Sequence, residues 1–303
     1  MTAADLTSTS ASPGPVDRAY RHCLSLARSH YENFPVASLL VPKRLRGPIA
    51  AIYAFARSAD DIADEGDVDA AVRLARLQGY RDRLQVLSRG ETVDDEPVFI
   101  AIADCSRRYS LPLSLFDDLL TAFIQDVRTT RYDTDAELMN YCRHSANPVG
   151  RLLLYLYGVA DDANLRDADA ICTALQLINF LQDLEQDYRE NNRIYIPQQA
   201  MHRHGVDESW FAQRRNDAAM RAMIDEQIDR ARSLLLQGAP LAWRLRGRFG
   251  LEIRLTVAGG LRILQRLAQS RENVFSRPRL HWPDKVWMFK RALMRQPVPE
   301  HSN

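Results

Sequence analysis

From about Val16 onwards, apolar side chains recur at intervals of three and four residues, the spacing of an amphipathic helix. No stretch shows the sustained alternation of apolar and polar residues that a half-buried strand requires. Gly and Pro residues separate the periodic segments and mark helix starts and stops. The pattern predicts an all-α protein with helices near residues 16–31, 48–64, 68–89, 98–109, 113–127, 135–158, 167–190, 207–237, 242–270 and 283–294.

The predicted helices belong to one domain. No fixed-period repeat occurs, and the connections are too short to act as domain linkers. Residues 1–15 are mostly Ser, Thr, Ala and Pro, without the basic start and apolar core of a signal peptide, and are expected to form a disordered leader. We therefore expect a leader over 1–15, one all-α domain over 16–296 and a short tail over 297–303.

One acidic segment closes the predicted helix that starts at Gly47-Pro48. Asp60 and Asp64 are four residues apart, so their carboxylates share one face of the helix. Like charges at this spacing repel, and the helix dipole at a C-terminal end also favours cations. The segment is either a solvated acidic helix end or a cation site.

The second acidic segment follows a helix that is apolar almost all round and is therefore expected to be buried. Gln176, Asn179, Asp183 and Asp187 form a polar stripe along it, at spacings of three, four and four. Buried carboxylates without a partner are costly. Either arginines of the bundle or a bound cation must compensate this pair.

Carboxylate ligands favour hard cations, Mg²⁺ or Ca²⁺, over zinc or iron. Mg²⁺ usually takes one or two carboxylates and completes its shell with water and substrate phosphate. The chain contains no glycine-rich nucleotide loop. Two aspartate pairs thus predict a metal clamp for a diphosphate. Candidate donors to the phosphate oxygens are His30, Lys43, Arg44, Arg46, Tyr53, Arg57 and Tyr141.

The composition limits the classes of partner and the cellular location that we expect for the chain. With 40 basic and 39 acidic side chains, the chain has no general electrostatic reason to bind nucleic acid. The longest uncharged run near the second acidic segment, Ala170–Gln182, is 13 residues, short of a membrane span. We expect a cytoplasmic protein, with a peripheral place at the inner face of the membrane as an alternative. The four cysteines are widely spaced and are expected to be buried, reduced thiols.

Three stretches resemble the squalene/phytoene synthase family: YAFARSADDIAD (53–64), YCRHSANPVG (141–150) and LQLINFLQDLEQDYRENNRIYIP (175–197). The resemblance covers roughly residues 16–270. It implies the α-helical isoprenoid synthase bundle with a central cavity, a prenyl diphosphate substrate and Mg²⁺ as cofactor. It assigns metal-ligand and catalytic roles to Asp60, Asp64, Asp183 and Asp187, with Asp61 and Asn179 as further candidate ligands. Catalytic or substrate contacts fall on His30, Phe34, Tyr53, Arg57, Tyr141, Asn147, Gln176 and Asn179.

Departures from the family pattern point to one branch. Gln182 stands where most members have Arg, Asn147-Pro148 replaces Gly-Thr, and Gly259-Gly260 replaces a late Tyr of the carotenoid enzymes. These features resemble the hydroxysqualene synthases of bacterial hopanoid biosynthesis, which implies presqualene diphosphate as substrate and water as nucleophile. Gly260 is expected to open space near the cavity, and Asn147 is a candidate for positioning the water.

Two other functions remain open. Within the family, the alternative is a synthase that condenses two prenyl diphosphates to squalene, dehydrosqualene or phytoene. Outside enzymes, the alternative is a non-catalytic helical assembly factor, which intact acidic segments disfavour. The sequence does not indicate an oligomeric state.

The segment Pro283–Arg295 reads as a basic amphipathic helix. It is expected either to dock on the bundle as a terminal helix or to contact a membrane surface.

Overall fold

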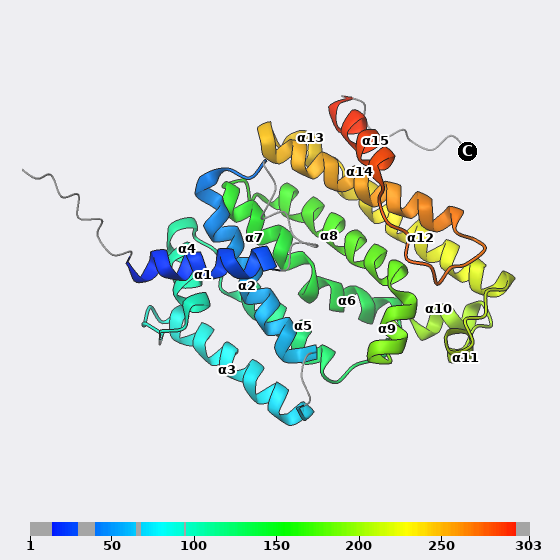
Figure 1. Ribbon diagram of the computed structural model, residues 1–303, viewed down its shortest axis with the longest axis horizontal. Coiled ribbons are helices and arrows are strands. Elements are labelled where there is room, and N and C mark those ends of the chain that lie inside the picture. The colour runs from blue at the N-terminus through cyan, green and yellow to red at the C-terminus, as the bar shows by residue number, and fades with distance from the viewer. Residues whose placement is uncertain (1–13, 30–39, 65–67, 94, 295–303) are drawn as a thin grey trace, which may run out of the picture.

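The computed structural model describes residues 14–29, 40–64, 68–93 and 95–294, and within these ranges every regular element is an α-helix (Figure 1). The all-α prediction is therefore confirmed. None of the helices in these ranges combines the length and apolarity needed to cross a membrane. The helices are α1 (Pro15–Ser29), α2 (Lys43–Asp64), α3 (Ala70–Ser88), α4 (Pro97–Tyr109), α5 (Ser114–Asp126), α6 (Asp135–Ser145), α7 (Asn147–Tyr157), α8 (Asp162–Gln182), α9 (Leu184–Asn191), α10 (Gln198–Arg203), α11 (Glu208–Ala212), α12 (Ala218–Gly238), α13 (Leu241–Arg244), α14 (Gly247–Gln269) and α15 (Trp282–Leu293).

Four predicted helices are each broken into two. The predicted helix 135–158 breaks at Ala146, because Pro148 in the first turn of α7 lacks the amide that would continue the hydrogen bonds of α6. The predicted helix 167–190 breaks at Asp183, 207–237 divides into α11 and α12, and 242–270 divides into α13 and α14. The short α10 was not predicted.

The start of α2 was also predicted wrongly. The helix begins at Lys43, so Pro48 lies inside it and not at its first position. Gly47 allows a close approach to α1, since a Cβ there would lie 3.0 Å from the Tyr20 ring. Sequence rules place Pro at a helix start, but here five residues precede it.

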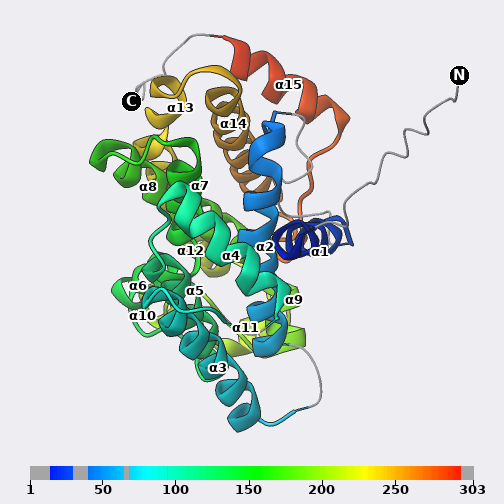
Figure 2. The ribbon, with the colours of Figure 1, turned by 90° about the vertical axis from the view of Figure 1, so that its left-hand side faces the viewer.

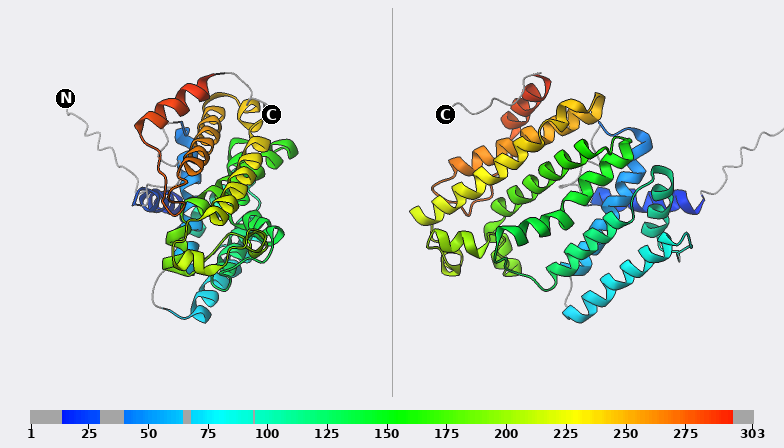
Figure 3. Two further views of the ribbon diagram at one scale, coloured as in Figure 1. Left: turned by 90° about the vertical axis from the view of Figure 1, so that its right-hand side faces the viewer. Right: turned by 180° about the vertical axis from the view of Figure 1, so that it is seen from behind.

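Two apolar cores meet at α7. One core gathers side chains of α1 to α5, and the other gathers side chains of α6 and α8 to α14 together with Ala122 of α5. Figures 2 and 3 show how these helices are arranged. Leu152 and Leu156 of α7 face the first core, and Leu154, half a turn away, faces the second. Because α5 and α7 contribute to both cores, the helices form a single domain.

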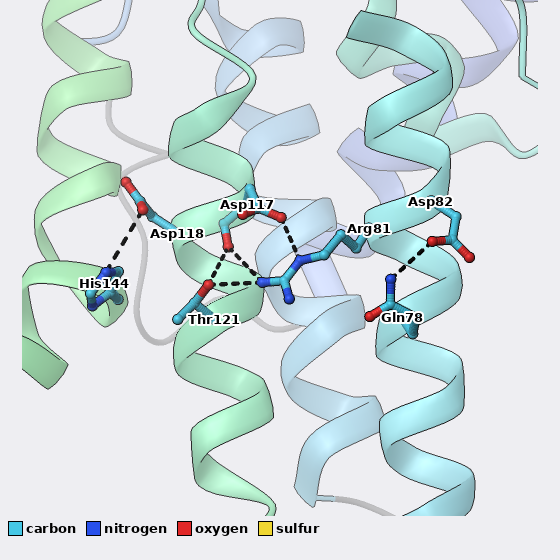
Figure 4. A network of polar contacts seen from close by, with 7 residues as sticks. All are labelled: Gln78, Arg81, Asp82, Asp117, Asp118, Thr121 and His144. Atoms are coloured by element: carbon cyan, nitrogen blue, oxygen red, sulfur yellow. Dashed lines mark hydrogen bonds and ion pairs between the residues drawn. The ribbon is translucent and has the colours of Figure 1, made fainter.

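Polar contacts fasten α3 and α6 to α5 (Figure 4). The Arg81 guanidinium of α3 lies 2.5 Å from Asp117 Oδ1 and donates to Thr121 Oγ1 at 2.8 Å. His144 of α6 lies 3.9 Å from Asp118. These contacts add to the small buried surface of α3, of which only Leu77 and Leu84 are fully buried.

The four cysteines are free thiols, as predicted, and three of them are buried. Cys172 differs, since it is partly exposed. The predicted leader, the tail, His30 and Phe34 lie wholly or almost wholly outside the described residues, and the domain limits 16–296 stay a prediction.

Candidate active site

The first acidic segment occupies the last turns of α2. Arg57 pairs with two of its carboxylates: Nη1 lies 3.3 Å from Asp60 Oδ2 and Nη2 lies 2.6 Å from Asp61 Oδ1. Ala59 is buried beneath them, whereas Asp64 is exposed at the helix end. Arg57, a candidate phosphate donor, is thus also the counter-ion of its own helix end.

The second acidic segment spans the break between α8 and α9. Asp183 lies at the break with φ −106° and ψ 16°. Its carbonyl accepts from the Asp187 amide at 2.8 Å, so the two aspartates stay one turn apart although the helix is interrupted. Burial raises the pKa of Asp183, and burial together with the neighbouring Asp183 raises the pKa of Asp187 to about 7. Both carboxylates would be stabilised by added positive charge.

Arg193 links the two acidic segments. Its side chain is almost wholly buried, and Nη2 lies 3.6 Å from Asp64 Oδ1 at the end of α2. The same guanidinium lowers the pKa of Asp187 on α9, although burial keeps that pKa high. Figures 1 and 2 show the C-terminal end of α2 and α9 at the same side of the molecule. The two segments therefore face one region, as the clamp hypothesis requires.

The buried residue Asp126 supports this arginine through its main-chain carbonyl. Arg193 Nη2 donates to the Asp126 carbonyl at 2.8 Å, and the Tyr141 hydroxyl donates to Asp126 Oδ2 at 2.9 Å. Burial raises the pKa of Asp126 to about 7 against the opposing charge of Arg193. The predicted substrate donor Tyr141 thus donates to Asp126, and its ring packs at a tilt against Tyr195 in an aromatic cluster.

The loop between α14 and α15 brings two further cations to the second segment. Arg277 Nε lies 2.6 Å from Asp183 Oδ1, and Arg279 lowers the pKa of Asp183 against its burial. Between them, the carbonyl of Pro278 accepts from Gln182 Nε2 at 2.7 Å. Gln182 therefore holds a loop that supplies two arginines beside Asp183.

The predicted polar stripe is present on α8. Asn179 is exposed between buried Ile178 and Phe180, and Gln176 is half-buried one turn earlier. Tyr53, on α2, is largely buried one turn before Arg57, and burial raises its pKa. Asn147 is buried and accepts from Thr173 Oγ1 at 2.9 Å. This bond joins α7 to α8, so the structure gives Asn147 a structural contact in addition to its predicted role.

An apolar cavity of about 320 Å³ lies beside the same helix. On α8 its wall includes Ala168, Cys172 and Leu175, and the next positions at helical spacing are Asn179 and Asp183. One face of α8 thus passes from the cavity to the acidic segment, about 12 Å from Leu175 to Asp183 at 1.5 Å per residue. The remaining wall comes from α2, α7, α13 and α14, and includes Ile49, Leu153, Tyr157, Leu241 and Phe249.

The expectation for Gly260 was wrong. A Cβ at Gly260 would lie 2.8 Å from Leu235 Cδ2 and 3.3 Å from both Ile178 and Leu175. Gly260 therefore permits tight packing of α14 on α12 and α8, and opens no space. Gly259 faces α15, where its Cβ would meet Met288 at 3.1 Å.

The donor set fits magnesium and not a softer metal. The carboxylates at the facing helix ends offer only oxygen. Burial raises the pKa of both Asp183 and Asp187 although nearby arginines oppose the rise, so a bound cation would favour their charged forms. Among the described residues, no three His, Cys, Asp or Glu side chains are grouped closely enough to hold a metal alone. An ion bound here would need substrate oxygens as ligands, which is how Mg²⁺ is commonly bound.

Sequence reasoning missed Asp126, Arg193, Arg277 and Arg279. Arg193 lies within the third family-like stretch, which was its only signal. The others carry no local pattern, because their roles depend on contacts between distant parts of the chain.

Comparison with known proteins shows the family. The squalene/phytoene synthase family model matches residues 7–285. A hydroxysqualene synthase of Rhodopseudomonas palustris is 36% identical over 252 residues, covering 82% of this chain and 83% of the relative. A second, from Zymomonas mobilis, is 37% identical over 243 residues, covering 79% and 77%.

Solved structures show the same fold. The squalene synthase HpnC from Alicyclobacillus acidocaldarius superposes with a TM-score of 0.80 at 36% identity, over 86% of this chain and 97% of that one. A dehydrosqualene synthase, 24% identical, has a TM-score of 0.77 over 92% and 98% of the two chains and supports the fold alone. With the acidic helix ends, the cavity and these matches taken together, the chain belongs to the squalene/phytoene synthase family of prenyl diphosphate enzymes.

Proposed function

We propose that this chain converts presqualene diphosphate to hydroxysqualene in a Mg²⁺-dependent reaction. The observation that carries the proposal is the approach of the two acidic segments to one buried arginine, at one end of a helix whose other end lines an apolar cavity. Relatives at 36% and 37% identity are named hydroxysqualene synthases.

The acidic segments would hold the ions. Asp60, Asp64, Asp183 and Asp187 are the proposed ligands, with Asp61 and Asn179 beside them. Bound Mg²⁺ would supply positive charge to the leaving diphosphate. Arg57, Arg193 and Arg277 already contact these carboxylates. When metal ions replace them there, the three arginines would become available to pair with the phosphate oxygens.

The loop arginines give the diphosphate a second set of partners. Arg277 and Arg279 lie beside Asp183, where guanidinium groups can donate two hydrogen bonds each to phosphate oxygens. Tyr53 and Gln176, and His30 and Phe34 outside the described residues, remain proposed substrate contacts.

The apolar cavity would hold the hydrocarbon part of the substrate. When the carbon–oxygen bond breaks, the diphosphate leaves with the electron pair, and a dry cavity protects the cation from early capture. One water then adds to the rearranged cation and loses a proton, so the products are the alcohol, diphosphate and H⁺. Asn147 stays a candidate for placing that water, held by its bond to Thr173.

A second function within the family has its own support. The solved structure at 36% identity is titled a squalene synthase. A condensing enzyme of that kind would use two prenyl diphosphates and release a hydrocarbon. The nature of the product therefore separates the two proposals.

The C30 product partitions into lipid, and we propose that the enzyme releases it at a membrane surface. We propose that the protein is otherwise cytoplasmic and reaches the inner face of the membrane only peripherally.

Release of diphosphate from presqualene diphosphate tests the ionisation step. Asp60→Asn and Asp183→Asn each remove one charge without changing side-chain size, and each should lower the rate at least about 100-fold, because metal neutralisation contributes several kcal/mol. Asp229→Asn, at an exposed carboxylate that pairs with Arg232 on α12, is the matched control and should leave the rate unchanged. Near wild-type rates in either acidic-segment variant would contradict the proposed clamp.

A further inference from the structure

Helix α15 turns an apolar stripe away from the protein. Trp282, Phe289 and Leu293 are 75%, 51% and 59% exposed, and Val286 lies between them along the helix. Their spacings of four, three and four place all four on one side. Of the six large apolar side chains that are well exposed among the described residues, four belong to α15 or to Met294, which follows it.

A buried ion pair fixes the rotation of α15. Asp284 has no exposed surface, and its two carboxylate oxygens lie 2.7 Å from Arg262 Nε and 2.6 Å from Arg266 Nη2 of α14. Met288 packs against Gly259 on this same inner side. Rotating α15 to bury the stripe would break this pair and leave an uncompensated charge inside the protein, which is strongly unfavourable.

The ring of Trp287 also lies toward the inner side of α15. Arg262 and Arg291 both lie over the Trp287 ring, at 5.4 and 5.5 Å from its centre. One side of the helix thus meets the bundle through Asp284, Trp287 and Met288, and the apolar stripe lies on the opposite side. A terminal helix that only docked on the bundle would need one apolar side.

The charges around the stripe all have one sign. Lys285 and Lys290 are exposed, and at 100° per residue they lie about 70° to either side of the centre of the stripe. Asp284 is the only carboxylate of α15, and it is buried on the opposite side.

We propose that α15 binds the protein to the surface of an anionic phospholipid bilayer. The helix would lie in the membrane plane, with Trp282, Phe289 and Leu293 at the level of the headgroups and acyl chains and with Lys285 and Lys290 on lipid phosphates. Figures 1 and 3 show α15 as the outermost helix at its edge of the molecule, where a flat surface can reach it.

A bilayer fits this side better than a second copy of the chain. A two-fold contact through the stripe would bring the lysines of one copy beside those of the other, since the same surface meets itself. Headgroup phosphates instead complement lysines on both flanks. The lipid character of the substrate class is a further reason, and in that respect the inference rests on the proposed function. The binding test below uses no substrate, so either can fail while the other stands.

Co-sedimentation of the full chain with vesicles tests the inference. The wild type should bind phosphatidylcholine vesicles that contain phosphatidylglycerol and should bind pure phosphatidylcholine at least about ten-fold more weakly. Phe289→Glu/Leu293→Glu should lose at least about ten-fold in binding to the anionic vesicles, because it places charge on the inserted side. Lys285→Gln/Lys290→Gln should lose the preference for anionic lipid. Val72→Glu, at an exposed apolar position on α3, is the control and should bind as the wild type does.

Circular dichroism and light scattering complete the experiment. Each variant should keep the wild-type helical spectrum, since the replaced side chains are exposed. The inference would be overturned if the wild-type protein did not bind anionic vesicles. It would also be overturned if Phe289→Glu/Leu293→Glu bound them as strongly as the wild type does. A wild-type dimer that Phe289→Glu/Leu293→Glu converts to a monomer, without vesicle binding by either, would assign the stripe to a second copy instead.

Discussion

Three arginines compensate the aspartates of the site while no ion is bound. Arg57 pairs within α2, Arg193 reaches Asp64 from beyond α9, and Arg277 reaches Asp183 from the loop before α15. Carboxylates that exchange arginine for a metal ion can stay ordered in both states. The arginines then lie within reach of the phosphate oxygens that bind with the ion.

The loop arginine should matter for diphosphate binding. We expect Arg277→Gln to weaken inhibition by inorganic diphosphate about ten-fold, since a hydrogen bond between charged groups contributes about 1.5–3 kcal/mol. Arg271→Gln is the matched control, because Arg271 is exposed in the same loop and pairs with Asp225, away from the acidic segments. Equal inhibition constants for the two variants would remove Arg277 from the site.

The raised pKa of Asp187, about 7, predicts how the metal-free protein responds to pH. The ordinary value is 3.8, so the folded protein holds a proton that the unfolded chain releases, and stability falls as the pH rises from about 4 to about 7. Asp187→Asn mimics the protonated form. A shift of about three pKa units corresponds to about 4 kcal/mol, which partial exposure of the side chain roughly halves.

Urea unfolding in EDTA measures this effect. Asp187→Asn should be about 2 kcal/mol more stable than the wild type at pH 8, with the difference vanishing near pH 4. Asp229→Asn, at the exposed surface of α12, should show no such pH dependence. A difference at pH 8 that persists unchanged at pH 4 would argue against proton binding at Asp187.

At the scale of single residues, the sequence indicates the aspartates of the site but not the side chains that pair with them. The spacing of Asp60 and Asp64, or of Asp183 and Asp187, is local and follows from helix geometry. The pairing of Arg193 with Asp64 joins residues more than a hundred positions apart and depends on where α9 ends. The bond of Gln182 to the Pro278 carbonyl depends on the loop before α15, which no local pattern predicts.

At the scale of elements, α8 organises the molecule. Its buried positions contact α7, α12 and α14, and its remaining face carries the cavity wall and the polar stripe. The break at Asp183 turns the chain into α9 while keeping Asp187 one turn away. Hydrophobic periodicity predicts that the helices exist, but it does not detect such breaks, because the apolar pattern continues across them.

Two helical glycines, one in a tight packing contact and one at an uncrowded position, should respond in opposite ways to substitution by alanine. Gly260→Ala should lower the free energy of unfolding by about 1–2 kcal/mol, because the new Cβ would lie 2.8 Å from Leu235. Gly79→Ala on α3 should raise it by about 0.5–1 kcal/mol, since there the Cβ meets only Arg83 at 3.6 Å and alanine favours the helix. Thermal or urea unfolding checks both. Stabilisation by Gly260→Ala would show that space is open at this position after all.

At the scale of the whole molecule, the acidic segments and the apolar cavity lie at different places along α8. The acidic helix ends lie at one end of the face of α8, the apolar cavity lies at the other, and α15 lies at an outer edge. The all-α class and the family follow from the sequence because helical period and motif spacing are local. The assembly of two cores around α7 and the outward stripe of α15 depend on packing, which the sequence pattern does not specify.

The central claim is that this fold ionises presqualene diphosphate and ends the reaction with water. Its most direct test is to incubate the purified protein with presqualene diphosphate and Mg²⁺ in H₂¹⁸O, without a nicotinamide cofactor. The mass of the product is then measured by mass spectrometry. We predict an alcohol of the C30 chain that carries one ¹⁸O from solvent, and no label in protein-free controls. A hydrocarbon product, or an alcohol without the label, would contradict the claim.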